Sequence, residues 1–236
     1  MAELSDIHYF NTQHDRWPEA YAFVEQVQHD SGQDPRNADE FQRRLDGLAR
    51  MRDPIGNQWR QAVDFVGEMV VFEDLFVHDH EPLWVPEHPK LKMPDIEYRD
   101  GDGLLVPVEV KHLNKPRDED DAFSMGQPFS GVIREEDLGY ERFLQKKVEG
   151  FVDHSAQKLE GYTTLRTQGD QDVASSISLE LLYSQSLESQ LISEMPGEAS
   201  MGDRLRVLAD TYVADKPVIA QISALDEYLP PAPNNR

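Results

Sequence analysis

The segment from Pro94 to Lys115, PDIEYRDGDGLLVPVEVKHLNK, constrains the fold of this chain more than any other. Side chains alternate across a strand, so in LLVPVEVKHL the valines face one side while Glu109 and Lys111 face the other. DGDG, at residues 100–103, separates this run from PDIEYR and indicates a hairpin turn. Pairing through that turn brings Asp95 near Glu109, whereas a slip of one residue would separate them. The segment therefore predicts a hairpin that gathers charged groups on one face.

The carboxylates of Asp95 and Glu109, placed side by side, repel each other unless a cation lies between them. Mg²⁺ suits such a position, because one or two carboxylates typically hold it while water and substrate phosphate fill the remaining octahedral positions. Lys111 then lies where it could orient or help to deprotonate an attacking water and offset charge on a phosphate. The competing interpretation is a solvated strand face on which Glu109 and Lys111 brace each other.

Periodic patterns along the rest of the chain predict alternating helices and strands. Apolar side chains repeat at helical spacing over residues 17–30, 37–51, 57–77, 141–162 and 202–214, with Asn37 as the expected N-cap of the second helix. Extended runs cover residues 81–87, 94–99, 104–113, 177–184 and 216–223. This order predicts an α/β fold in which helices flank a mixed central sheet.

Three regions follow from these patterns. Residues 1–55 are expected to form a helical N-terminal extension, residues 56–228 an α/β domain, and residues 229–236 a Pro-rich tail. The extension either packs on the main domain or forms a helical hairpin that binds a partner. The polar stretch at residues 116–139 is expected to be a long exposed loop.

The composition is strongly acidic, with 45 acids against 23 bases and a formal charge of -22. A salt-rich cytoplasm favours such a surface, because dense carboxylates stay hydrated there and their repulsion is screened. An ordinary acidic protein with a basic partner is the other explanation. The chain has no cysteine, no pattern of a signal peptide and no apolar run long enough for a membrane span. A cytoplasmic protein without membrane contact is the simplest expectation.

Pro94-Asp95 and Glu109-Val110-Lys111 together resemble the signature of the PD-(D/E)xK nuclease superfamily, the restriction endonuclease-like proteins. The context is similar, because the two halves lie on consecutive predicted strands joined by a hairpin and preceded by a hydrophobic helix. In that helix Glu68 of FVGEMVVFEDLF matches an acid that often joins the family's metal site. The resemblance covers residues 57–162 well and the last two strands loosely, but not the first 55 residues.

The resemblance implies a metal-dependent phosphodiesterase that usually cuts DNA. Asp95 and Glu109 would bind Mg²⁺, for which Mn²⁺ substitutes, and Glu68 and the carbonyl of Val110 would assist. Lys111 would handle the attacking water. The helix after the lysine strand often carries a lysine or glutamine that faces the site. Residues expected to bind substrate, unless they are ordinary surface residues, are Gln157, Lys158, Lys115 and Lys146.

Two other clusters are weaker metal-site candidates. His78–Glu81, with His88 nearby, has no zinc-site spacing and follows a helix in a polar connection, which favours a loop. Asp118–Asp121 is expected to be a solvated acidic loop. The sequence contains neither a Gly-rich phosphate loop nor a G-x-S-x-G elbow.

The net charge opposes the nuclease hypothesis, because nucleic-acid affinity depends on basic groups and a charge of -22 repels a polyanion. A local basic rim could offset it. The alternative is a catalytically inactive nuclease fold that binds a protein partner through the N-terminal helices and the acidic surface. A homodimer stays open as well. The candidates for the basic rim are Arg99, Arg117, Arg134, Lys115, Lys146 and Lys147.

Overall fold

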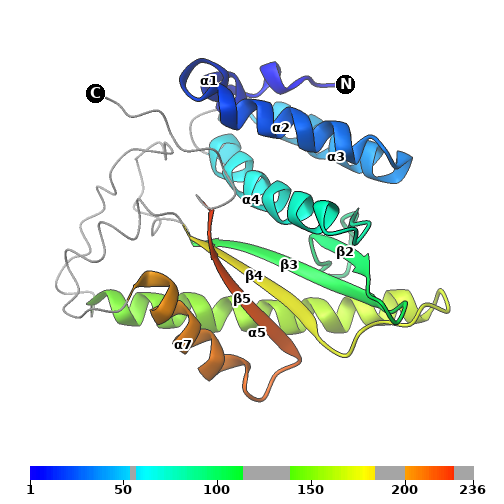
Figure 1. Cartoon of the computed structure of the whole chain (residues 1–236), viewed down its shortest axis with the longest axis vertical. Coiled ribbons are helices and arrows are strands. Elements are labelled where there is room, and N and C mark those ends of the chain that lie inside the picture. Colours follow the sequence, from blue (N-terminus) through cyan, green and yellow to red (C-terminus); the bar gives the residue numbers. More distant parts are fainter. Residues whose placement is uncertain (54–56, 114–138, 184–199, 226–236) are drawn as a thin grey trace.

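A five-stranded mixed sheet in the order β1-β2-β3-β4-β5 forms the centre of the computed structural model (Figure 1). The structure describes residues 1–53, 57–113, 139–183 and 200–225. Strand β2 is antiparallel to both of its neighbours, β1 and β3, whereas β4 and β5 run parallel to β3. The expectation of an α/β fold with a mixed sheet is confirmed. The strands are β1 (Leu83–Trp84), β2 (Ile96–Arg99), β3 (Leu105–Leu113), β4 (Ile177–Tyr183) and β5 (Val218–Ala224).

The predicted hairpin between β2 and β3 has the expected register. Ile96 lies opposite Val108 and Arg99 opposite Leu105. The Gly103 N–H closes the turn by donating to the Asp100 carbonyl at 3.0 Å, and the Leu104 N–H donates to Asp100 Oδ1 at 2.9 Å. Arg99 Nη1 also donates to the Gly103 carbonyl, at 2.7 Å. Gly103 has a φ of 81°, a conformation that a side chain would strain. The turn chemistry therefore fixes the pairing on which the predicted site depends.

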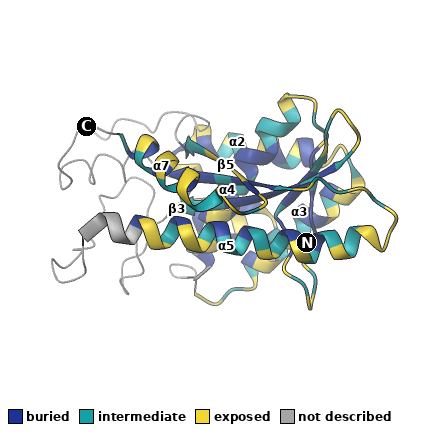
Figure 2. Ribbon diagram, turned by 90° about the horizontal axis from the view of Figure 1, so that it is seen from below, coloured by how far each residue is buried: buried dark blue, intermediate teal, exposed yellow. Residues whose placement is uncertain are grey.

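Helices cover both faces of the sheet in layers (Figures 1 and 2). The long helix α4 lies on one face, and α1, α2 and α3 pack on it from outside. Helices α5 and α7 cover the other face. The sequence patterns missed α1 and a short 3-10 helix before it, at Leu4–Asp6. The α-helices are α1 (His8–Arg16), α2 (Pro18–Ser31), α3 (Pro35–Ala49), α4 (Asn57–Val77), α5 (Gly139–Thr167) and α7 (Met201–Val213).

Alternation along the central strands divides the core into two clusters. Val108 and Val110 of β3 join the cluster of α4 and the N-terminal helices. Leu113 of β3 and Leu179 of β4 join the cluster of α5 and α7. The valine face therefore packs against α4, and Glu109 and Lys111 lie on the face toward α5.

Asn37 is not the N-cap of α3, contrary to the sequence expectation. The helix begins one residue after Asp34, whose side chain accepts a hydrogen bond from the Arg36 N–H. Asn37 is buried and bonds the short strand β1, donating to the Pro82 carbonyl and accepting from the Trp84 N–H, both at 2.9 Å. These bonds attach α3 to the sheet edge. The extended run at residues 81–87 contains only this two-residue strand.

A buried polar cluster fixes α5 against β2. Tyr162 Oη and Arg166 Nη2 each donate to Glu97 Oε2 at 2.5 Å. Tyr162 is fully buried, and the Arg166 guanidinium lies over its ring at 5.2 Å from the centroid. Because an unpaired buried carboxylate is costly, the three side chains hold these elements in one relative position.

Two glycines of α5 differ in their surroundings and give a matched test of the packing. A Cβ at Gly161 would lie 3.0 Å from the Lys92 carbonyl oxygen, whereas a Cβ at Gly150 would have no neighbour within 4 Å. Alanine gains roughly 1 kcal/mol over glycine in a helix interior. Gly150→Ala is therefore expected to raise the free energy of unfolding by about 1 kcal/mol. In Gly161→Ala overpacking outweighs the gain, with a net loss of about 1 kcal/mol in urea unfolding. Equal gains in both variants would show that the contact at Gly161 is not tight.

Glu73 on α4 and Asp30 on α2 form an acidic contact whose stability depends on pH. Burial, together with the charge of Asp30, raises the pKa of Glu73 to about 7. The folded chain thus binds more protons than the unfolded chain between the ordinary glutamate pKa and about 7, so this group lowers stability as pH rises through that range. Glu73→Gln is expected to raise the free energy of unfolding by about 1 kcal/mol at roughly pH 8 and to change it little at roughly pH 4.

Thermal and urea unfolding across that pH range measure the effect. Glu25→Gln, at an exposed position of α2, serves as the matched control. The same gain at both pH values in Glu73→Gln would contradict a titrating contact.

Among the described helices, none combines the length and the hydrophobicity that crossing a membrane requires.

Candidate functional site

Asp95 stands at the start of β2 and is held there by main-chain bonds. Its N–H donates to the Val108 carbonyl at 3.0 Å, and its carbonyl accepts from the Val85 N–H at 3.1 Å. Its carboxylate oxygen Oδ2 accepts from the Val110 N–H at 2.8 Å. The register that pairs residue 96 with residue 108 places Asp95 level with Glu109. The structure therefore brings together the two carboxylates that the hairpin pattern predicted.

Glu109 is completely buried on the face of β3 that looks toward α5, and two ammonium groups accompany it. Lys158 Nζ lies 2.5 Å from Glu109 Oε2, and Lys111 forms an ion pair with Glu109 Oε1. Lys158 Nζ also lies 3.5 Å from Asp95 Oδ1. The ammonium of Lys158 thus occupies the position between the two carboxylates where a cation is needed.

The electrostatics of the three charged residues on the hairpin depend on these pairs. Burial raises the pKa of Glu109 to about 7, and the charge of Asp95 adds to the shift while Lys111 and Lys158 oppose it. Burial also disfavours ionised Asp95, but Lys158 and Lys111 outweigh it and lower the pKa of this carboxyl. Likewise, Asp95 and Glu109 outweigh burial and raise the pKa of Lys111 above its ordinary value. Near neutral pH, Asp95 is ionised and Lys111 is an ammonium, whereas Glu109 is close to the midpoint of its titration.

Glu68 reaches the same region from α4. The preceding residue, Gly67, lets the helix approach the sheet, because a Cβ there would lie 3.3 Å from Leu182 Cδ1 and 3.9 Å from Val110 Cγ1. Burial raises the pKa of Glu68 to about 7, the charge of Arg44 opposes the shift and the charge of Asp95 adds to it. Glu68 is therefore electrostatically linked to the hairpin carboxylates and forms its own ion pair with Arg44.

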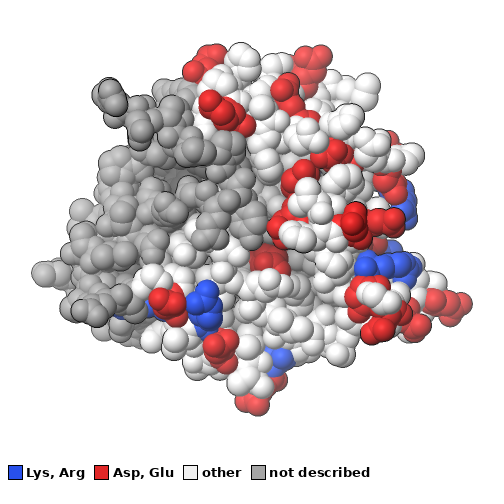
Figure 3. Space-filling model, viewed as in Figure 1, with Lys and Arg blue, Asp and Glu red and all other residues white. Residues whose placement is uncertain are grey.

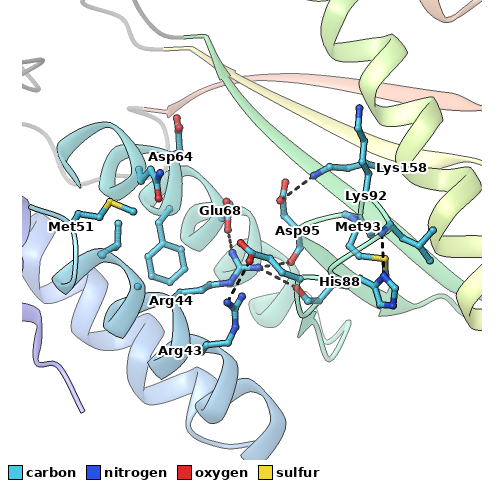
Figure 4. Close-up of a pocket in the computed structure, with 18 residues that line it drawn as sticks. Arg43, Arg44, Met51, Asp64, Glu68, His88, Lys92, Met93, Asp95 and Lys158 are labelled. Atoms are coloured by element: carbon cyan, nitrogen blue, oxygen red, sulfur yellow. Dashed lines mark hydrogen bonds and ion pairs between the residues drawn. The ribbon is translucent and has the colours of Figure 1, made fainter. Parts of the chain in front are cut away.

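A pocket of about 600 Å³ opens beside these groups (Figure 4). Its walls come from α3, the first turns of α4, residues 85–95 and Lys158 of α5. Glu68, Asp95 and Lys158 point into it from three different elements (Figure 4). The volume is in the range of small-ligand and cofactor sites. Glu68 and Asp95 thus line a defined cavity, whereas Glu109 is completely buried behind it.

Two basic residues of α3, Arg43 and Arg44, belong to the wall of this pocket, and sequence patterns did not identify them. Arg44 pairs with Glu68, and Arg43 pairs with Glu40. Both arginines lie in an amphipathic helix with many charged residues, and no local signal distinguishes them from its solvated face. Their role depends on how α3 docks on α4, which a local pattern does not encode.

The other residues expected at the site have different positions. Lys158, for which a surface position was the competing interpretation, lies between the carboxylates. Gln157 is exposed and accepts a hydrogen bond from Lys92 Nζ at 2.9 Å. Lys146 is exposed, three turns earlier on α5 and outside the pocket lining. The carbonyl of Val110 accepts from Lys111 Nζ at 3.1 Å. Lys115, Arg117, Arg134 and Asp118–Asp121 lie outside the described residues.

The histidines after α4 do not form a site. His78 bonds the Asp74 carbonyl, His80 packs on the Tyr98 ring, and His88 accepts from the N–H groups of residues 90 and 91. Within the ranges that the structure describes, no three or more His, Cys, Asp or Glu side chains are arranged to hold a metal ion. Asp95 and Glu109 are therefore a pair of carboxylates around an ammonium, with Glu68 bound separately by Arg44.

Acidic side chains are spread over the face shown in Figure 3, including the N-terminal helices at the upper right. Basic side chains appear there in few places, which agrees with the formal charge of -22. The basic groups of the pocket are thus local exceptions on a negative molecule. Comparison of the chain with protein-family models, curated proteins and solved structures gave no match.

Proposed function

We propose that the chain is a Mg²⁺-dependent nuclease of the PD-(D/E)xK class that hydrolyses DNA phosphodiester bonds. The observation that carries the proposal is the alignment of Asp95 with Glu109 across the hairpin, with a cationic group between them. The order of elements adds support, because α4, the β2–β3 hairpin and α5 follow one another as the sequence resemblance implies.

The donor set fits a hard divalent cation. Lys158 Nζ lies 2.5 Å from Glu109 Oε2 and 3.5 Å from Asp95 Oδ1, and this shared position supports a cation site between the two carboxylates. Glu109 Oε1 pairs with Lys111, but a carboxylate oxygen has two lone pairs, so it can bind a cation beside that ammonium. Two carboxylates leave further positions for water and phosphate, as Mg²⁺ requires. When bound, the cation would supply charge stabilisation at the phosphate and activation of water.

The residues of the hairpin would then have different roles in the reaction. Asp95 and Glu109 hold the cation, and binding favours the ionised form of Glu109 whose pKa lies near 7. Lys111 pairs with Glu109 and its Nζ donates to the Val110 carbonyl at 3.1 Å, so its ammonium lies beside the carboxylates and would act on the phosphate and the attacking water as a positive charge.

Lys158 has a flexible side chain that can leave the carboxylates when a divalent cation enters. A four-carbon stem lets its ammonium move while the helix stays in place. The displaced group would remain at the wall of the pocket, which Lys92 and Arg43 also line. These three cations give a phosphate local partners on a molecule whose overall charge repels nucleic acid.

The second candidate is a metal-free scaffold that binds a protein partner through the N-terminal helices and the acidic surface. The observation in its favour is that Arg44, Lys111 and Lys158 provide one positive charge for each of Glu68, Asp95 and Glu109. A site balanced in this way is complete without a metal. The two candidates differ in whether Mn²⁺ binds at millimolar concentration.

The test combines cleavage and calorimetry on the full chain. Supercoiled plasmid, single-stranded DNA and RNA are incubated with Mg²⁺, Mn²⁺ or a chelator, and Mn²⁺ binding is titrated separately. We expect Mn²⁺ to bind and DNA to be cut only when a divalent cation is present. Mn²⁺ binding without cleavage of any substrate would overturn the nuclease proposal. The absence of both, with a protein recovered on a pull-down that depends on residues 1–53, would favour the scaffold.

A further inference from the structure

Arg44 of α3 connects the N-terminal helices to the candidate site through contacts with residues outside its own helix. Its side chain is only 15% exposed, although it is an arginine on a helix that packs against the outside of α4. Its guanidinium lies 4.9 Å from the ring centroid of Trp84 and 5.6 Å from that of Phe65. These two cation–π contacts hold the guanidinium beside the rings, and its N–H groups remain available for polar partners.

The N–H groups of the Arg44 guanidinium make three contacts with the site (Figure 4). Nη1 pairs with Glu68 Oε2, and Nη2 donates to the main-chain carbonyls of Asp95, at 3.3 Å, and Val85, at 3.4 Å. On its own helix, Nε pairs with Glu40 at 3.2 Å. One side chain therefore joins the acid of α4 to the backbone of the residue that carries the first hairpin carboxylate.

We infer that Arg44 is a positioning residue for the divalent cation, acting through Glu68 and the backbone of Asp95. The N-terminal extension is then part of the active site and not only a cover on α4. The inference rests on the proposed function, because it assigns a role within the same metal site. It adds a residue from the part of the chain that the nuclease signature does not include.

The chemistry explains why an arginine is needed. The side chain of Glu68 is only 17% exposed, and a largely buried carboxylate that loses its partner is unfavourable. A planar guanidinium binds a carboxylate and main-chain carbonyls together in fixed directions, whereas a lysine ammonium is a single point charge. Groups that orient metal ligands commonly contribute roughly 10- to 100-fold to metal affinity.

The test measures Mn²⁺ affinity by calorimetry in Arg44→Met, Arg44→Lys and Arg36→Met, at a temperature where circular dichroism shows each variant folded. Arg36 is the control, because it is exposed at the other end of the same helix, where it pairs with Asp34. We expect Arg44→Met to weaken Mn²⁺ binding roughly 10- to 100-fold, Arg44→Lys to recover part of the loss, and Arg36→Met to bind like the wild type.

A double variant separates positioning from a general structural role. If Arg44 acts through Glu68, then Arg44→Met in a Glu68→Gln background weakens Mn²⁺ binding by less than in the wild type, since coupled residues are not additive. Arg44→Met with unchanged affinity, or losses that simply add, would overturn the inference. Failure of the proposed function gives a different result. If the wild-type chain binds Mn²⁺ but cuts no substrate, and Arg44→Met still weakens Mn²⁺ binding, the positioning role of Arg44 stands without the nuclease activity. Wild-type chain that binds no Mn²⁺ overturns both.

Discussion

Replacing Glu109 by glutamine is expected to lower Mg²⁺-dependent DNA cleavage roughly 100- to 1,000-fold. The amide has nearly the same shape as the carboxylate, so the buried position next to Lys158 and Lys111 is not emptied. It lacks the negative charge that holds the cation, and one of its two terminal atoms becomes a donor facing an ammonium. The measurement is the initial rate of plasmid nicking over a range of Mg²⁺ concentrations, with Mn²⁺ affinity from calorimetry.

Glu160→Gln is the control for this variant, because Glu160 is an exposed residue of α5. Its rate should equal that of the wild type. Full cleavage in Glu109→Gln would show that the activity arises at another site or from a contaminant. Glutamine is preferred to alanine, since a cavity at a completely buried position would mix a loss of stability with the loss of charge.

Replacing Lys158 by methionine is expected to cost about 3 kcal/mol of folding free energy in the absence of metal. Lys158 compensates Asp95 and Glu109 together, and its removal leaves Lys111 alone against two carboxylates in a buried setting. Methionine keeps the length of the side chain and its apolar contacts. The loss should be greater at roughly pH 8 than at roughly pH 5, because protonation of Glu109, whose pKa is already raised, relieves the repulsion.

Mn²⁺ is expected to restore the lost stability and to raise the melting temperature more in Lys158→Met than in the wild type. In the wild type the incoming cation must displace an ammonium, whereas in the variant the position between the carboxylates is free for it. Lys90→Met, at an exposed loop position, serves as the control. Equal Mn²⁺-induced shifts in the wild type and Lys158→Met would contradict the idea that lysine and metal compete for one position.

The hairpin and the general class of fold could be predicted from the sequence because their determinants are local. The valines at alternate positions determine which face of β3 enters the core, and the DGDG turn determines its register against β2. Asp95, Glu109 and Lys111 lie within that one segment, so the pattern that predicted the hairpin also predicted their proximity. The apolar side chains of α4 repeat at helical spacing, and the helix has the bounds expected from that pattern.

The remaining parts of the site depend on how distant elements dock. Lys158 and Gln157 are neighbours in the sequence, but the rotation of α5 places only Lys158 between the carboxylates. Arg44 and Asn37 belong to a helix with charged residues throughout, and each has a buried partner on another element. Because helix docking is set by tertiary packing, no local signal distinguishes such residues from a solvated surface.

The Tyr162–Glu97–Arg166 cluster determines what kind of motion the candidate site can use. Tyr162 is four residues after Lys158, so its bond to Glu97 fixes both the axial position and the rotational phase of α5 one turn from the site. Sliding or turning the helix would break this bond in the protein interior. A cation exchange at the carboxylates is therefore a change of lysine rotamer against a stationary backbone, with a timescale of side-chain motion and not of domain opening.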